Sequence, residues 1–403
     1  MSATSQTTLL NKPRLIEIMR AERIDAMVAT SPENVTYTSG YWALSQWIRR
    51  GPQIYVLLPQ SDLNASEIIA STTLLDQIAD QADVWIRNVR RYGYFQVDRA
   101  NAPLDQLDQR QAGLYALTDD GSPLDALVKA ITSRGLSRSR IAVDEIGLLP
   151  GHWERLAEAL PNATLVPAFQ LLRRVRAVKT DEEIARLGRV ARITEDSIDA
   201  ALSIASEGVT ESELARPFHS CTVMNDAFPV IGCIGFGTRA AMPNVQPSAT
   251  PLKRGDVIRF DVGGRYRHYR ADIARIAVLG EADRKTADYC HALHVGVLKA
   301  LEMIRPGVRA SDVFATAVEA VRREGIGHYN RSHVGHGIGL DGYDLPDLTA
   351  ASQDIIEERM VMCVETPYYE LGWTGLQVED MVVVRRDGIE SLMSSSGGLR
   401  IVP

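Results

Sequence analysis

Two aspartates in the second half of the sequence are spaced so that they can face each other. They stand in the stretch 255–280, GDVIRFDVGGRYRHYRADIARIAVLG, where two strand-like runs flank a turn that contains a Gly-Gly pair. If this hairpin folds about Tyr266–Arg267, residues equidistant from the turn lie opposite each other, and Asp261 and Asp272 form such a pair. Carboxylates so close repel each other unless a cation lies between them, so we expect a divalent metal ion there.

A second pair of acids and one histidine extend this set. In the stretch 361–384, VMCVETPYYELGWTGLQVEDMVVV, Glu365 and Glu379 are equidistant from a turn centred near Gly372. His336 lies in the glycine-rich segment SHVGHGIGL (332–340), where the backbone can approach a metal closely. Four carboxylates and one imidazole suit two divalent ions that share ligands, and they favour Mn²⁺, Co²⁺, Fe²⁺ or Zn²⁺ over a thiolate-type site.

Each of these residues taken alone has an ordinary explanation as a solvated turn or loop residue. The strands that hold the acids are nevertheless rich in apolar residues such as Val257, Phe260 and Val364, which predicts a buried sheet. Unpaired carboxylates in a buried sheet are strongly destabilising. The combination therefore indicates metal ligands.

The first 165 residues alternate between helical and strand-like patterns. We expect a helix over 12–24, a strand over 25–29, a turn over 31–41, and strands over 53–59 and 141–150. This alternation predicts an α/β domain.

The pattern changes near residue 175. A long amphipathic helix is expected after Thr180, where Glu183 completes a capping box, and a second helix after Thr210, with Glu213 three residues on. From about residue 229 the chain becomes strand-rich. We therefore predict two domains, residues 1–170 and 171–403.

The composition is that of a globular protein and excludes several classes. The chain has 403 residues, 45% hydrophobic and 24% charged, with a net charge of −7. We expect no nucleic-acid or membrane partner, because the acidic balance disfavours phosphate binding and no apolar run of membrane-spanning length occurs. The N-terminus does not read as a secretory signal, and the four cysteines are dispersed without CxxC spacing, so a cytoplasmic location is expected.

The order D-x10-D, GHGIGL, ET-P and QVED resembles the pita-bread metallopeptidase family, which includes methionine aminopeptidase, Xaa-Pro aminopeptidase, prolidase and creatinase. The segment RLIEIMRAERIDAMVATSPENVTYTSGY is similar to the creatinase/prolidase N-domain, and VRAVKTDEEIARL to the start of the family's catalytic domain. The resemblance implies an α/β N-terminal domain followed by an α+β pita-bread catalytic domain. It also implies a homodimer.

The resemblance assigns a role to each acid and to the histidine. Asp261 would chelate one metal, and Asp272 and Glu379 would bridge both. His336 and Glu365 would bind the other metal, and Glu365 would also move the proton of the attacking water.

Two positions depart from the family pattern. Asn244 and Tyr343 stand where family peptidases usually carry histidines that steady the substrate. Both can still donate hydrogen bonds, but neither shuttles protons near neutral pH. His333, three residues before His336, could partly compensate, although it reads equally well as a loop residue.

These observations predict a dinuclear metallohydrolase, in first place an Xaa-Pro aminopeptidase or prolidase-like peptidase acting on small peptides, with Mn²⁺ the preferred metal. The alternative is a metal-dependent hydrolase or lyase of a small non-peptide metabolite, because Asn244 and Tyr343 alter the shell that handles the substrate. A binding module on the same fold is a third hypothesis, which the five intact ligands disfavour.

Overall fold

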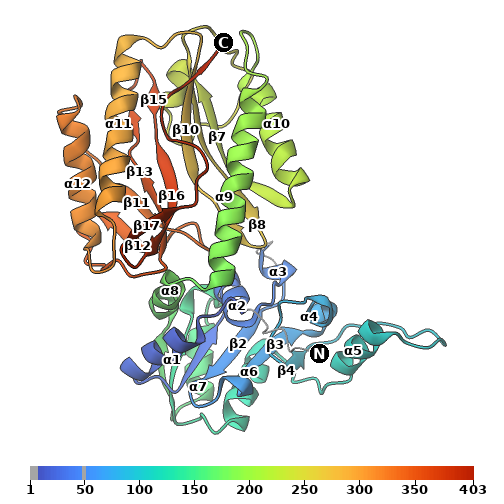
Figure 1. Cartoon of the computed structure of the whole chain (residues 1–403). Coiled ribbons are helices and arrows are strands. Elements are labelled where there is room, and N and C mark those ends of the chain that lie inside the picture. The colour runs from blue at the N-terminus through green and yellow to red at the C-terminus, as the bar shows by residue number, and fades with distance from the viewer. Residues whose placement is uncertain (1–7, 48–50) are drawn as a thin grey trace. The chain divides into compact units, whose positions relative to one another are not determined.

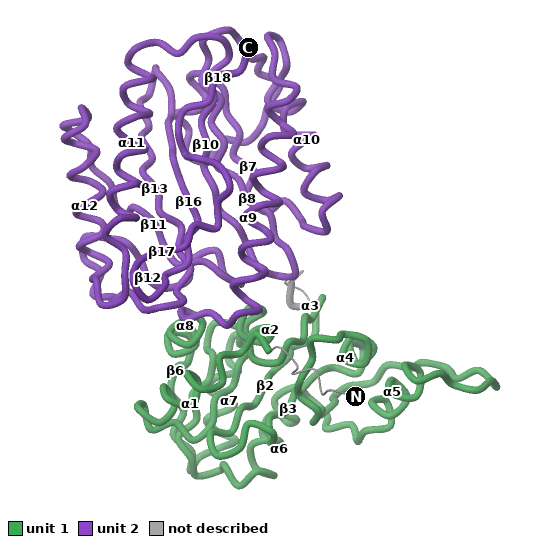
Figure 2. The backbone as a smooth tube through the Cα atoms, viewed as in Figure 1, with its two compact units in different colours: residues 1–176 green, residues 177–403 purple. Residues whose placement is uncertain are grey.

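The computed structural model describes residues 8–47 and 51–403. The chain forms two compact units, residues 1–176 and 177–403, which Figure 2 shows in green and purple. In the described residues, no helix is long and apolar enough to span a membrane.

The first unit is built on a mixed six-stranded sheet (Figure 1). Its strand order is β4-β3-β2-β1-β5-β6, parallel at β3–β4, β1–β5 and β5–β6 and antiparallel elsewhere. The strands are β1 (Ala26–Ala29), β2 (Tyr55–Pro59), β3 (Glu67–Ser71), β4 (Asn88–Tyr92), β5 (Arg140–Val143) and β6 (Thr164–Pro167). Their apolar residues pack with helix α6 in a buried core, as the predicted α/β pattern requires.

Helices surround this sheet. They are α1 (Lys12–Ala21), α2 (Pro32–Ser39), α3 (Leu44–Trp47), α4 (Leu75–Asp80), α5 (Gln106–Tyr115), α6 (Pro123–Ser133), α7 (His152–Ala159) and α8 (Phe169–Ala177), with short 3-10 turns at Leu63–Ala65, Thr72–Leu74 and Glu145–Gly147.

Two expectations for the first unit were wrong. The predicted turn over 31–41 is mostly helix α2, which begins with a proline in its first turn and ends at Gly40 in the left-handed conformation (φ 75°). The strand expected over 141–150 ends at Val143, because the chain turns there and Gly147 passes against the backbone of Thr30. A Cβ at Gly147 would lie 2.4 Å from that backbone.

The second unit is built on a ten-stranded sheet. Its main path is β12-β11-β13-β16-β10-β8-β7, with β17 paired to β16, β18 to β10 and β9 to β8. The strands are β7 (Ala227–Phe236), β8 (Val257–Tyr266), β9 (Tyr269–Arg270), β10 (Ile273–Leu279), β11 (His333–Gly337), β12 (Asp344–Thr349), β13 (Val361–Glu365), β16 (Glu379–Arg385), β17 (Gly388–Ser391) and β18 (Arg400–Val402); β14 (Tyr368–Tyr369) and β15 (Gly375–Leu376) form a separate ribbon.

Four helices pack on this sheet. Helix α9 (Asp181–Leu202) contacts β8, and helix α10 (Glu211–Met224) contacts β7 (Figure 1). Helix α11 (Arg284–Met303) contacts β13, and helix α12 (Ala310–Arg323) contacts β12. A 3-10 turn covers Gly237–Ala241. Capping boxes begin α9 at Thr180 and α10 at Thr210, as predicted. Met362 and Val364 belong to the same buried cluster as Leu293 and Val297 of α11. Alternation along β13 therefore turns the odd-numbered residues of this strand away from the helices.

One of the two predicted hairpin registers is correct. Strands β13 and β16 pair Glu365 directly with Glu379, as the spacing about Gly372 predicted. The other hairpin turns about Arg267 and His268, both of which have positive φ, one residue later than expected. Asp261 is consequently opposite Ala274 instead of Asp272.

Candidate metal centre

The sheet of the second unit carries the predicted ligands on one face. A row of direct cross-strand partners runs Asp261, Ala274, Glu379 and Glu365 through strands β8, β10, β16 and β13. Because side chains two residues apart on a strand share a face, Asp272 is on the same side as Ala274 and is the diagonal neighbour of Asp261. Ala274 places only a methyl group between the flanking residues Asp261 and Glu379.

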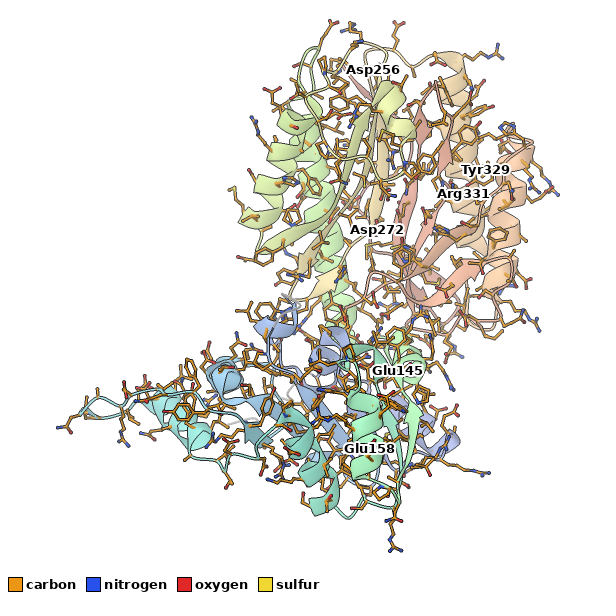
Figure 3. All side chains as sticks on the ribbon, turned by 180° about the vertical axis from the view of Figure 1, so that it is seen from behind. Glu145, Glu158, Asp256, Asp272, Tyr329 and Arg331 are labelled. Carbon is orange, nitrogen blue, oxygen red and sulfur yellow. The ribbon has the colours of Figure 1, made fainter. Side chains whose placement is uncertain are left out.

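A second row on this face brings in the histidine. His336 of β11 is the direct partner of Cys363 of β13, and Cys363 precedes Glu365 by two residues. Figure 3 shows Asp272 among the strands of the second unit.

Ligand atoms from these rows come together in two groups that share Glu379. Asp261, Asp272 and Glu379 form one group, and His336, Cys363 and Glu379 form the other, each with its ligand atoms within 4.8 Å of one another. Glu365 is in neither group, but Gln377 Nε2 donates to Glu365 Oε2 at 3.1 Å and to Glu379 Oε2 at 3.4 Å. Four of the five predicted ligands thus occupy the two groups, and the fifth is linked to them.

The electrostatics of the cluster call for cations. Burial raises the pKa of Asp272 and Glu379 well above the usual range, and the neighbouring carboxylates raise both further. Burial also raises the pKa of Asp261, to about 6, against the opposing charge of Arg259. Asp272 Oδ1 is buried and has no hydrogen-bond partner among the described residues. An oxygen-rich donor set with an unsatisfied buried carboxylate oxygen fits divalent metal ions.

His336 is held in an orientation suited to ligation. Its Nδ1 lies 3.0 Å from the carbonyl oxygen of Gly337, so Nδ1–H donates there and Nε2 keeps a free lone pair. Nε2 lies 3.9 Å from Asp272 Oδ2, and burial lowers the pKa of the ring. A neutral imidazole with Nε2 facing the carboxylates is the form that binds a metal.

The three other predicted site residues differ in position. His333 Nε2 lies 3.0 Å from Glu365 Oε1, so this residue contacts a predicted ligand. The ring of Tyr343 packs on that of His336, with centroids 4.2 Å apart. Asn244 is exposed on the loop after the Gly237–Ala241 turn, and no hydrogen bond joins its side chain to the described ligands.

Comparison with known proteins places this geometry in a family. The family model "Metallopeptidase family M24" matches residues 185–386, and "Creatinase/Prolidase N-terminal domain" matches residues 13–178. The chain belongs to metallopeptidase family M24.

Curated and solved relatives agree with this assignment. A putative dipeptidase of Bacillus subtilis is 27% identical over 69% of this chain and 77% of its own length. An Xaa-Pro dipeptidase of Pyrococcus furiosus is 29% identical over 55% of this chain and 64% of its own length, slightly under two thirds. The solved Xaa-Pro dipeptidase from Bacillus anthracis has a TM-score of 0.79 at 22% identity, covering 97% of this chain and all of that one (100%), and shows the shared fold.

The M24 assignment confirms the predicted creatinase-type N-terminal domain, the pita-bread catalytic fold and the class of metallopeptidase-family hydrolase. It also implies divalent metal ions as cofactors.

The structure adds two polar residues that sequence reasoning missed. Arg259 is fully buried two residues before Asp261, and Gln377 is buried two residues before Glu379. Arg259 Nη1 donates to Asp261 Oδ2 at 3.2 Å and to Gln377 Oε1 at 2.9 Å. A polar residue two positions before a ligand on a strand shares its face, and this signal was available in the sequence.

Cys363 is a third missed residue at the candidate site. Its thiol is fully buried between His336 and Glu379, and burial raises its pKa well above the usual range. The thiol therefore stays protonated, and Sγ lies 3.6 Å from the carbonyl oxygen of Asp272. The cysteine was set aside because the sequence has no CxxC spacing, but it stands two residues before Glu365 on the same strand face.

Proposed function

We propose that this M24 chain hydrolyses small peptides of the Xaa-Pro type with the help of two divalent metal ions. The observation that carries the proposal is the shared position of Glu379 in two neighbouring ligand groups, because a carboxylate common to two groups can bridge two ions. Asp261 and Asp272 would complete one metal position, and His336 and Glu365 the other.

The metal ions, when bound, would polarise the scissile carbonyl and lower the pKa of the attacking water. Glu365 is positioned to take the proton of that water and return it to the leaving nitrogen. Its Oε1 lies 3.0 Å from His333 Nε2, and its Oε2 accepts a hydrogen bond from Gln377 Nε2. These two contacts hold the carboxylate group in one orientation. His333 Nδ1 lies 3.0 Å from Ser332 Oγ, which suits the tautomer whose Nε2–H donates to Glu365.

Tyr343 replaces a proton-shuttling histidine with a hydrogen-bond donor. Burial and the charges of Asp272 and Glu365 raise its pKa to about 12, so the hydroxyl stays protonated near neutral pH. We propose that it donates to the substrate carbonyl oxygen. Asn244 would supply a second amide donor from the loop whose carbonyls, at Met242 and Pro243, accept hydrogen bonds from Arg259.

The peptide substrate is favoured over the non-peptide alternative. The curated relatives described above are dipeptidases, and the metal-binding residues are intact. Mn²⁺ is the proposed physiological metal, with Co²⁺, Fe²⁺ or Zn²⁺ as substitutes. Residues 171–403 would form the catalytic domain and residues 1–170 its N-terminal partner, in a cytoplasmic homodimer.

Metal analysis combined with peptide hydrolysis tests the proposal. Purified protein should bind about two Mn²⁺ per chain, cleave an Xaa-Pro dipeptide, and lose activity with a chelator until Mn²⁺ or Co²⁺ is restored. Glu379→Gln should lose both metals and activity, whereas the matched control Glu390→Gln, on the exposed strand β17, should keep both. Full peptidase activity without bound metal would refute the metal mechanism.

A further inference from the structure

Cys363 faces the ligands of the second group instead of the apolar core. Its neighbours in β13, Met362 and Val364, pack in one buried cluster with residues of helix α11. Alternation along the strand therefore turns Cys363 to the opposite face. The residue is fully buried, and its Sγ atom and single ligand atoms of His336 and Glu379 all lie within 4.8 Å of one another. The thiol thus belongs to a group of donor atoms.

These three donor atoms are spaced for one metal ion. Zinc lies about 2.0–2.3 Å from nitrogen and sulfur ligands, so two ligand atoms of one ion are at most about 4.6 Å apart. The separations in the second group reach this range with little or no movement. In the metal-free protein, Cys363 Sγ lies 3.6 Å from the carbonyl oxygen of Asp272, a weak hydrogen bond that a metal ion can replace.

An unsatisfied carboxylate oxygen points to a cation at the same place. The side chain of Asp272, which Figure 3 labels, is only 10% exposed, and its Oδ1 has no hydrogen-bond partner among the described residues. The other oxygen, Oδ2, lies 3.9 Å from Nε2 of His336, which is a member of the second group. A cation held by the second group would therefore lie close to a carboxylate that lacks a partner.

The acid that the family resemblance assigns to this position already has other contacts. Glu365 is in neither ligand group. Its Oε1 lies 3.0 Å from His333 Nε2, and its Oε2 accepts a hydrogen bond from Gln377 Nε2. While these contacts persist, the second position needs another anionic donor, and the thiolate of Cys363 supplies one.

The two ligand groups differ in the kind of ion that they favour. Asp261, Asp272 and Glu379 offer only oxygen atoms, which suit Mn²⁺. An imidazole and a thiolate suit Zn²⁺ better. Because only the thiolate form of cysteine ligates a metal, an ion that binds there displaces the thiol proton to solvent.

We propose that Cys363 Sγ is a ligand of the second metal position, together with His336 and Glu379, and that this position takes Zn²⁺ or a similar thiophilic ion in preference to Mn²⁺. This inference rests on the proposed two-metal function and deepens it, because it names a further ligand and the class of ion.

X-ray absorption spectroscopy of the zinc-loaded wild type tests the sulfur ligand directly. The full chain is freed of metal with a chelator, loaded with excess Zn²⁺, desalted and measured at the zinc edge. We expect a sulfur neighbour about 2.3 Å from zinc, with one sulfur per pair of ions. A spectrum with only nitrogen and oxygen neighbours would overturn the proposal, and this measurement does not require any variant to fold.

Cobalt spectroscopy assigns the sulfur to a residue. Wild type loaded with Co²⁺ should show a near-ultraviolet charge-transfer band from thiolate to Co²⁺, and Cys363→Ser should lack it. The matched control Cys233→Ser should keep the band, because Cys233 is the buried cross-strand partner of Asp261 but is in neither ligand group. A band that survives in Cys363→Ser would contradict the assignment.

Cys363→Ser should also change the metal selectivity. Zn²⁺ affinity should fall by about 10- to 100-fold or more, since the removal of a group that only supports a metal ligand already has an effect of this size. Mn²⁺ affinity should change less, because Mn²⁺ accepts oxygen donors. Competition between the two ions, followed by metal content, measures the difference. Equal losses for both ions would show that Cys363 only packs the site.

These readouts separate the ligand from the proposed function. Zinc without a sulfur neighbour, in a protein that cleaves Xaa-Pro dipeptides with Mn²⁺, would overturn the role of Cys363 and leave the peptidase intact. A zinc–sulfur contact that depends on Cys363, in a protein that cleaves no peptide, would support the ligand and refute the peptidase function. Protein that binds no metal would refute both.

Discussion

Arg259 Nη1 lies 3.2 Å from Oδ2 of Asp261, two residues along the same strand, and the Arg259 side chain is fully closed to solvent. The guanidinium also donates to Gln377 Oε1 and to the carbonyl oxygens of Met242 and Pro243. One permanent cation therefore partly offsets the charge of the carboxylates and joins the loop before Asn244 to the candidate metal centre.

Arg259→Met should destabilise the metal-free protein by about 1–3 kcal/mol, because it leaves the partly buried carboxylate of Asp261 and the carbonyl oxygens of Met242 and Pro243 without their donor. Addition of Mn²⁺ should recover part of this loss, since the ion replaces the missing positive charge. Urea denaturation with and without Mn²⁺ measures both effects. The control Arg284→Met removes an exposed side chain and should change the free energy of unfolding little. Equal stability of the two variants would contradict this role for Arg259.

Metal binding should release protons. The pKa of Asp261 is raised to about 6, and burial raises those of Asp272 and Glu379 well above their usual range. At pH 6 about half of the Asp261 carboxyls are therefore protonated, and a cation must displace these protons. Calorimetric titration with Mn²⁺ in two buffers of different ionisation enthalpy should show proton release that falls as the pH rises, and affinity that increases with pH.

The raised pKa values of these carboxyls also determine how the stability of the metal-free protein changes with pH. A carboxyl whose pKa is higher in the folded state binds protons that the unfolded state has already lost. Its contribution is therefore favourable at low pH and is lost as the pH rises, for Asp261 between the ordinary value of 3.8 and about 6. Metal-free wild type should lose more stability over this window than Asp261→Asn, and an equal loss would argue against the raised pKa.

Part of the strand pairing at the candidate centre could be predicted from the sequence, because cross-strand geometry follows from spacing. Glu365 and Glu379 pair as expected, since a turn centred between them determines the register. The other turn is displaced by one residue, to Arg267 and His268. Both have positive φ, which is usually adopted by glycine or asparagine, so the sequence did not mark the turn at this position. This displacement moves each partner by two positions, so Asp261 and Asp272 stay on one face although they are no longer opposite.

Other features depended on contacts that spacing alone does not reveal. Arg259 contacts Gln377, and Cys363 pairs with His336, on strands that are distant in the chain. Strand alternation places each of them on the same face as the ligand two residues later, but it does not reveal these contacts. Helix α2 was missed because Pro32 and Asn34 also favour turns, and the burial of the segment decides in favour of the helix.

Tyr343→Phe should separate hydrogen bonding from packing at the substrate side. The phenyl ring keeps the contact with His336, whereas the proposed donor to the substrate carbonyl is lost. We expect kcat to fall by about 10²-fold with unchanged metal content, the scale found when one transition-state donor is removed. Tyr343→His should recover part of the activity. A Phe variant with wild-type kcat would show that the hydroxyl takes no part in catalysis.

The segment that carries Tyr343 is held by a buried ion pair, and Gly339 makes room for it. Lys179 Nζ lies 3.1 Å from Asp344 Oδ2, with both side chains closed to solvent. A Cβ at Gly339 would lie 2.7 Å from that oxygen and 3.2 Å from Lys179 Nζ, so Gly339→Ala must displace the pair.

We expect Gly339→Ala to lower the free energy of unfolding by about 1–3 kcal/mol and to reduce kcat, because the displaced segment moves Tyr343 relative to His336. Gly342→Ala is the matched control three residues away, since an added Cβ there has no neighbour within 4 Å. Thermal unfolding and dipeptide hydrolysis, measured on both variants, test the expectation. If Gly339→Ala is as stable and active as Gly342→Ala, then the ion pair does not position Tyr343, and the structure accommodates a Cβ at Gly339 without loss of stability or activity.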